Sequence, residues 1–133
     1  MTGLSINKFI YNILQSDKEL AWMCNNIYPL VIEEDTLKKN PLRFPFILFT
    51  RDNVQPIDTK EYVVGDRVTF SIAIVSDKYL TTVDIAERVR LLFEKRRDNY
   101  FSETNLTSCT EDYSNDAYVQ RLSFSATILK NEI

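Results

Sequence analysis

The chain has 133 residues, enough for one domain that buries roughly two-thirds of the surface its unfolded form would expose. Its 16 basic and 19 acidic residues give a formal charge of -3, which disfavours nonspecific binding to nucleic acid and polybasic attachment to a membrane. Histidine is absent, which removes the commonest general base, the catalytic triads built on it and the usual zinc ligand.

The N-terminal third begins with two predicted helices. Apolar residues at helical spacing predict a helix over 4–15, for which Ser5 is a candidate cap. Asp17 is itself a good N-cap, so we expect a break there and a second helix over 18–24, with Trp22 and Met23 plugging the edge of the core. The start shows no charged region followed by an apolar run, and no stretch approaches bilayer length, so we expect a cytoplasmic protein.

Two short apolar runs follow. Residues 27–32 contain Pro29, which cannot donate a ladder hydrogen bond, so this run is predicted to be a short edge strand. A charged surface loop is expected over 33–41. Residues 45–50 are apolar at consecutive positions, which is typical of a central strand covered on both faces or lying at a subunit contact.

The segment 51–65 joins two strands that should lie antiparallel, and it is longer than the usual hairpin loop of about two to five residues. Tyr62, Val63 and Val64 are too apolar for a loop tip that is exposed to solvent and makes no contacts. They either extend the hairpin or await a partner, and the sequence leaves both interpretations open.

A strand and the helix after it are expected to nucleate the core. Over 66–76 a period of two places one apolar stripe on a single face, formed by Val68, Phe70, Ile72 and Ile74. Over 81–95 apolar residues recur at helical spacing, namely Ile85, Ala86, Val89, Leu92 and Phe93. The strand and the helix each have one apolar side, and packing them together buries both of these sides.

The C-terminal part contains a polar segment, 98–116, in which Tyr100 and Phe101 are expected anchors and part of which is a candidate for a paired strand. Residues 118–128 alternate cleanly between apolar and polar, which predicts the last strand. The predicted fold is therefore α+β: a single domain over 1–133, with a mainly antiparallel sheet of about four to five strands packed against two principal helices.

No catalytic, cofactor-binding or metal-binding site is predicted. Phosphate loops and nucleophile elbows need glycines at fixed places, and the only two are Gly3 and Gly65. The acidic runs 33–35 and 111–112 lack the alternating ligands of a calcium loop and read as solvated charge. Cys24 and Cys109 form no paired motif and are expected to be reduced thiols.

The order of these elements resembles the tail-completion, or tail-to-head joining, family of long-tailed bacteriophages and prophages. The resemblance rests on Tyr28-Pro29, the 45–49 and 68–75 strands and the 85–93 helix stripe. It implies a non-catalytic α+β subunit that assembles as a homo-oligomeric ring, commonly a hexamer. The implied partners are a tail-tube or tail-terminator protein and a head-connector protein, and the implied location is the bacterial host cytoplasm during assembly and then the virion.

A closed ring needs two different patches on each subunit, because its interfaces run head to tail. The apolar excess of the 45–50 strand and of the long hairpin supplies the candidate assembly interface: Phe46, Leu48, Val54, Tyr62, Val63 and Val64. Two other classes stay open at this stage. They are a small cytoplasmic ligand- or peptide-binding module and an enzyme whose chemistry uses a close pair of carboxylates.

Overall fold

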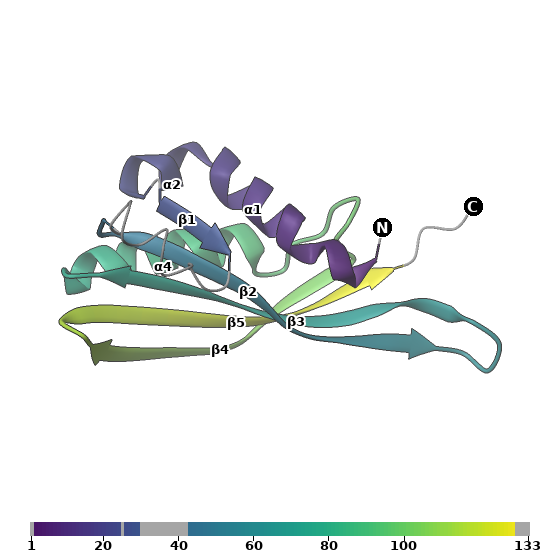
Figure 1. The fold of residues 1–133 in the computed structure, drawn as a ribbon. Coiled ribbons are helices and arrows are strands. Elements are labelled where there is room, and N and C mark those ends of the chain that lie inside the picture. Colours follow the sequence, from purple (N-terminus) through teal and green to yellow (C-terminus); the bar gives the residue numbers. More distant parts are fainter. Residues whose placement is uncertain (1, 25, 30–42, 130–133) are drawn as a thin grey trace, which may run out of the picture.

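The computed structural model describes residues 2–24, 26–29 and 43–129 (Figure 1). The described helices are η1 (Gly3–Ser5), α1 (Ile6–Ser16), α2 (Lys18–Met23) and α4 (Tyr79–Phe93). The described strands are β1 (Asn26–Pro29), β2 (Phe46–Asp58), β3 (Val63–Ser76), β4 (Glu103–Ser114) and β5 (Ala117–Leu129). This is the predicted α+β architecture. No described helix is both long enough and apolar enough to span a membrane.

The five described strands form one mixed sheet in the order β1-β2-β3-β5-β4. The pairs β2–β3, β3–β5 and β4–β5 are antiparallel, whereas β1 pairs with β2 in parallel from Asn26–Phe46 to Pro29–Phe49. The predicted edge strand with Pro29 is confirmed for the four residues of β1. The rest of that predicted strand and the predicted 33–41 loop lie outside the described residues.

The core lies between the sheet and the helices. All four residues of the predicted β3 stripe are fully buried, and they share one cluster with Ile85, Val89 and Phe93 of α4 and with Ile6, Ile10 and Leu14 of α1. Figure 1 shows these helices lying on one side of the sheet. At the centre, the Phe70 and Phe124 rings stack at 5.1 Å, and Phe93 meets Phe70 edge-on at 5.7 Å. The predicted strand–helix nucleus is confirmed.

The N-terminal helices break at Asp17 as expected, and its carboxylate accepts a hydrogen bond from the Leu20 amide at 2.9 Å. Ser5 makes no side-chain cap bond, and Thr2 caps η1 instead, by accepting from the Leu4 amide. The placement of Trp22 in the core was wrong: its side chain is 89% exposed. The cap fixes the rotation of α2 so that Leu20 points inward, and Trp22, two residues further along, points outward.

The segment predicted as a long connection is mostly paired strand. β2 continues to Asp58 and β3 begins at Val63, so the loop consists of residues 59–62 and the extended-hairpin interpretation is confirmed. Most of the polar 98–116 segment is also strand, because β4 pairs with β5 along its length. Phe101 is fully buried, and Tyr100 stacks on Phe9 at a centroid distance of 3.8 Å, as expected of anchors.

Candidate assembly interface

The β2–β3 hairpin extends past the end of β1. Among the described residues, β2 pairs only with β3 from residue 51 onward. The turn at the tip is fixed by groups other than its apolar side chains: the Thr59 amide donates to the Tyr62 carbonyl at 2.9 Å, and the Thr59 hydroxyl contacts the Tyr62 amide and carbonyl at 3.2 Å. Tyr62 is 60% and Val63 40% exposed. The tip therefore exposes apolar side chains on a turn whose backbone is fixed by hydrogen bonds.

The six candidate interface residues lie in three separate places. Tyr62 and Val63 are together at the exposed tip, with half-buried Val64 next to them. Phe46 is buried and Leu48 half-buried at the other end of the sheet, in a small cluster with Val75 and Ala117. Val54 packs against the main core on the helix-covered side. Of the six, the structure brings only the three tip residues into one exposed patch.

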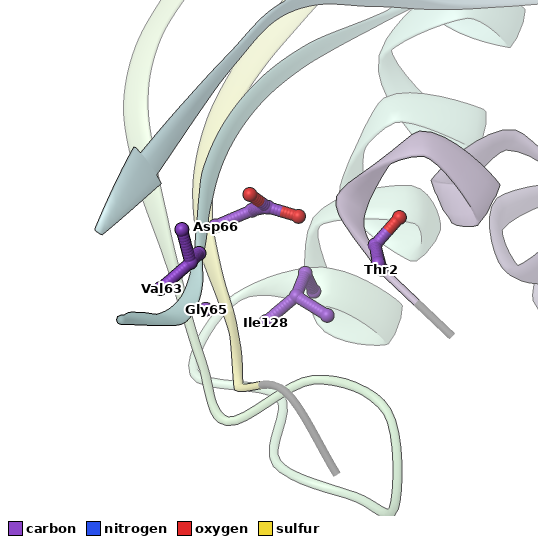
Figure 2. A pocket seen from close by; sticks show the side chains of 5 residues that line it. All are labelled: Thr2, Val63, Gly65, Asp66 and Ile128. Atoms are coloured by element: carbon purple, nitrogen blue, oxygen red, sulfur yellow. The ribbon is translucent and has the colours of Figure 1, made fainter. Parts of the chain in front are cut away.

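A hollow of about 220 Å³ lies at the base of the hairpin, lined by Thr2, Val63, Gly65, Asp66 and Ile128 (Figure 2). The Asp66 carboxylate accepts a hydrogen bond from the Gly3 amide at 2.7 Å. A Cβ atom on Gly65 would lie 2.5 Å from the Ile128 carbonyl oxygen, and one on Gly3 would lie 2.5 Å from Val68 Cγ2. Both glycines of the chain are thus needed where the N-terminus and β5 meet the hairpin.

This junction is held further by Tyr100, whose hydroxyl donates to the Thr2 carbonyl. Burial raises the pKa of Tyr100 to about 12, and the Asp66 carboxylate adds to that shift. The hydroxyl consequently stays protonated and able to donate throughout the ordinary pH range. We interpret the hollow as a structural junction that fixes the direction of the hairpin relative to the body.

A second hollow, of about 340 Å³, lies at the opposite end of β3, beside the β4–β5 turn. It is lined by Tyr79, Glu111, Asp112, Tyr113, Tyr118 and Gln120. The rings of Tyr113 and Tyr118 lie 4.7 Å apart, and Tyr79 meets Tyr118 edge-on at 5.5 Å. We call this set of six residues the tyrosine pocket.

One carboxylate organises the tyrosine pocket. Glu111 Oε2 accepts hydrogen bonds from Gln120 Nε2 and from the Tyr79 hydroxyl, both at 2.9 Å. These two bonds lower the pKa of Glu111, and the bond to Glu111 raises the pKa of Tyr79. Near neutral pH the pocket therefore holds an ionised Glu111 carboxylate bonded to the neutral phenol of Tyr79.

The sequence alone does not predict this pocket: residues 111–112 are exposed, as expected of a solvated acidic run, and that prediction contained no aromatic neighbours. The three rings come from α4, β4 and β5, and only the fold brings them together. One signal was present: Tyr113 and Tyr118 flank the tight turn at Asn115 and Asp116, whose φ angles of 52° and 61° suit those residue types. Within the described part of the chain, no group of three potential metal ligands gathers at this or any other place.

Two of the basic residues after α4, Lys95 and Arg96, have structural partners. Arg96 donates to the Leu92 carbonyl at 3.0 Å and pairs with Asp98 at 2.8 Å, and Lys95 Nζ donates to Asn105 at 2.8 Å. They complete the last helical turn and join it to β4. The two cysteines form no disulfide with each other, as predicted; Cys24 is buried and Cys109 is exposed.

Comparison with known proteins identifies the fold. No model of a protein family matches the chain, and no curated protein matches it. Among solved structures, a chain of the "Virion of native gene transfer agent (GTA) particle" is similar, with a TM-score of 0.74 at 16% sequence identity. The match covers 91% of this chain and 92% of that one. The two chains therefore share a fold over most of their lengths, at a low level of sequence identity.

Proposed function

We propose that this protein is a non-catalytic structural subunit of a phage-like virion, and that it forms a ring that completes the tail end and joins the tail to the head. The observation that carries the proposal is the match, over 91% of the chain, to a component of a gene transfer agent virion. The order of elements, which resembles that of tail-completion proteins, supports the more specific role.

The surface of the molecule suits ring formation. Head-to-tail rings require two different, complementary patches on each subunit, and a protrusion can supply one of them. The hairpin tip supplies an apolar protrusion, with Tyr62 and Val63 exposed at the end of a strand pair fixed at its base by Gly65. Aromatic residues such as Tyr62 are enriched among the side chains that dominate interface energetics.

The proposed partners follow from this role. Besides further copies of itself, the subunit would contact a tail-tube or tail-terminator protein on one side and a head-connector protein on the other. It would be present in the cytoplasm of the bacterial host during assembly and in the virion afterwards.

Native mass tests the proposal. Light scattering of the purified chain across a concentration series, alone and with cognate tail tubes, should show a discrete ring of about six subunits, or a monomer that forms one only on tube ends. Electron microscopy of the tubes should then show extra density at their ends. A monomer that ignores both concentration and tubes would contradict the proposal and favour a ligand- or peptide-binding module.

A further inference from the structure

The tyrosine pocket has the composition of a site for a cationic side chain. The faces of aromatic rings attract ammonium and guanidinium groups, and Tyr79 and Tyr113 remain 42% and 55% exposed. Tyr113 and Tyr118 form one wall, at a ring separation of 4.7 Å, and Tyr79 forms another. A cation entering the hollow would meet ring surface on more than one side.

The charge of the pocket fits the same ligand. Glu111 Oε2 is occupied by Tyr79 and Gln120, but no described residue donates to Glu111 Oε1, which keeps its capacity to accept. Asp112 lines the same hollow. The nearest cations along the chain are Lys78, which precedes Tyr79, and Arg121, which follows Gln120, and neither is among the lining residues. The pocket thus has two acidic lining residues, of which Glu111 has a free carboxylate oxygen, and no cationic lining residue.

A suitable cation lies at the far end of the same molecule. The hairpin tip reads Thr59-Lys60-Glu61-Tyr62, so Lys60 is its one lysine or arginine. Lys60 is exposed, and the turn around it is closed by Thr59 and Tyr62 without its side chain. Next to this charge stands the exposed Tyr62 ring, which would add aromatic contact with the tyrosine pocket.

The tip of one molecule cannot reach the pocket of the same molecule. β3 starts beside the tip at Val63 and ends at Ser76, which pairs with Tyr118 of the pocket. Its 14 residues put about 43 Å between the two patches, at about 3.3 Å per residue. Figure 1 shows the β2–β3 tip and the β4–β5 turn at opposite ends of the sheet. A second copy is therefore required.

We propose that the tyrosine pocket receives the hairpin tip of a second copy of this chain, with the Lys60 ammonium bound between the tyrosine rings and the carboxylate of Glu111. This inference rests on the proposed ring and identifies the two patches of its head-to-tail contact. It assigns the protruding patch to Lys60 and Tyr62, and the receiving patch to the end of the sheet where β4 turns into β5.

Charge reversal tests the contact. Lys60→Glu and Glu111→Lys should each weaken association by about tenfold or more, because each places like charges together. The double variant should recover most of the loss, since it restores an opposite-charge pair between copies. Lys8→Glu, a reversal of an exposed charge on α1, is the matched control and should change association little. Single variants that assemble normally, or a double variant that recovers nothing, would overturn the inference.

Cross-linking gives a second readout that does not depend on affinity. Chains carrying Lys60→Cys and chains carrying Tyr113→Cys, both with Cys109→Ser, are mixed and oxidised with and without tail tubes. We expect a disulfide-linked heterodimer, and none when Lys8→Cys replaces Lys60→Cys. Native Cys24 is buried, and burial raises the pKa of its thiol, so it should not compete.

The two proposals fail differently. Rings that form without this cross-link and resist charge reversal would overturn the tyrosine-pocket contact and leave the proposed function standing. Chains that cross-link as expected but never act on tubes would support the contact and contradict the role in joining tail to head. Chains that neither cross-link nor associate, with or without tubes, would contradict both.

Discussion

Arg88 on α4 forms a two-bond ion pair with Asp17, the residue that caps α2. Arg88 Nη2 lies 2.6 Å from Asp17 Oδ1, and Arg88 Nε donates to Asp17 Oδ2 at 2.8 Å. The same Oδ2 accepts the Leu20 amide at 2.9 Å, and the Asp17 side chain is only 12% exposed. One carboxylate therefore starts a helix and fastens it to its neighbour in the layer that covers the sheet.

Replacing Asp17 should make the protein less stable, and by an amount that depends on pH. Loss of the cap alone costs about 1 kcal/mol, and Arg88 also loses its partner. The bond from Arg88 and the Leu20 amide lower the pKa of Asp17 against the opposing effect of burial. Its contribution is therefore complete above the unfolded pKa of about 4 and is lost as pH falls through the lower folded pKa.

Urea unfolding of Asp17→Ala and Asp17→Asn at several pH values between neutral and acid tests this. Both variants should be less stable than the parent at pH 7, and the difference should shrink as the pH falls below about 4. Asp17→Asn should lose less, because asparagine can still cap a helix. Glu19→Gln is the control, since Glu19 also pairs with Arg88 but is 72% exposed. A difference that grows in acid would contradict the assignment.

The aromatic centre of the core should be the most costly place to truncate. Phe70 is fully buried among Phe93, Phe101 and Phe124. Phe70→Ala should reduce the free energy of unfolding by about 3–5 kcal/mol, since it loses apolar burial and leaves a cavity. Trp22→Ala removes a larger side chain that is 89% exposed and should change stability by less than about 0.5 kcal/mol. Similar losses for both variants would contradict the placement of Trp22.

The sequence predicts those helices and strands whose buried face is defined by the local spacing of apolar residues. The β3 stripe and the α4 stripe repeat every two and every three to four residues, so each specifies its buried face without reference to the rest of the chain. The parallel pairing of β1 with β2 has no such local signal, because it depends on how α1 and α2 place β1 beside the sheet. The predicted antiparallel character therefore held for three of the four described pairs.

The places of Phe46, Leu48 and Val54 show why the face on which a strand residue lies cannot be predicted from its sequence number alone. Phe46, Leu48 and Val54 are all even-numbered, so a regular strand would place them on one face. The structure has a register shift between Arg51 and Asn53, and a bulge of one residue reverses the alternation beyond it. Val54 consequently opposes Val68 and packs with the core, whereas Leu48 lies on the other face.

Gly65 should be the position on the hairpin least able to accept a side chain. The Cβ atom of Gly65→Ala would lie 2.5 Å from the Ile128 carbonyl oxygen and 3.1 Å from Leu129 Cα, and backbone atoms cannot rotate away. We expect a loss of about 1–3 kcal/mol in unfolding free energy and faster amide exchange at the base of the hairpin. Leu129→Ala, a change in the paired and 51% exposed residue, should cost less. Equal stability of Gly65→Ala and the parent would contradict this prediction and show that β5 shifts to accommodate the added Cβ atom.

The hairpin tip should matter for assembly and not for folding. Tyr62→Ser and Val63→Ser, combined in one chain, remove exposed apolar surface but leave the turn, whose bonds use the Thr59 hydroxyl and main-chain groups. Circular dichroism and the melting temperature should therefore match the parent, while native mass should show fewer rings and tail tubes should recruit less protein.

Leu91→Ser provides the control for that experiment, because Leu91 is 72% exposed on α4 and lies outside every proposed contact. If only the tip variant loses assembly, the loss is specific to the hairpin and not a general effect of reduced surface hydrophobicity. If the tip variant forms normal rings, the hairpin has no part in them, and the contact with the tyrosine pocket falls as well. If Leu91→Ser alone impairs assembly, the outer face of α4 becomes the interface to pursue.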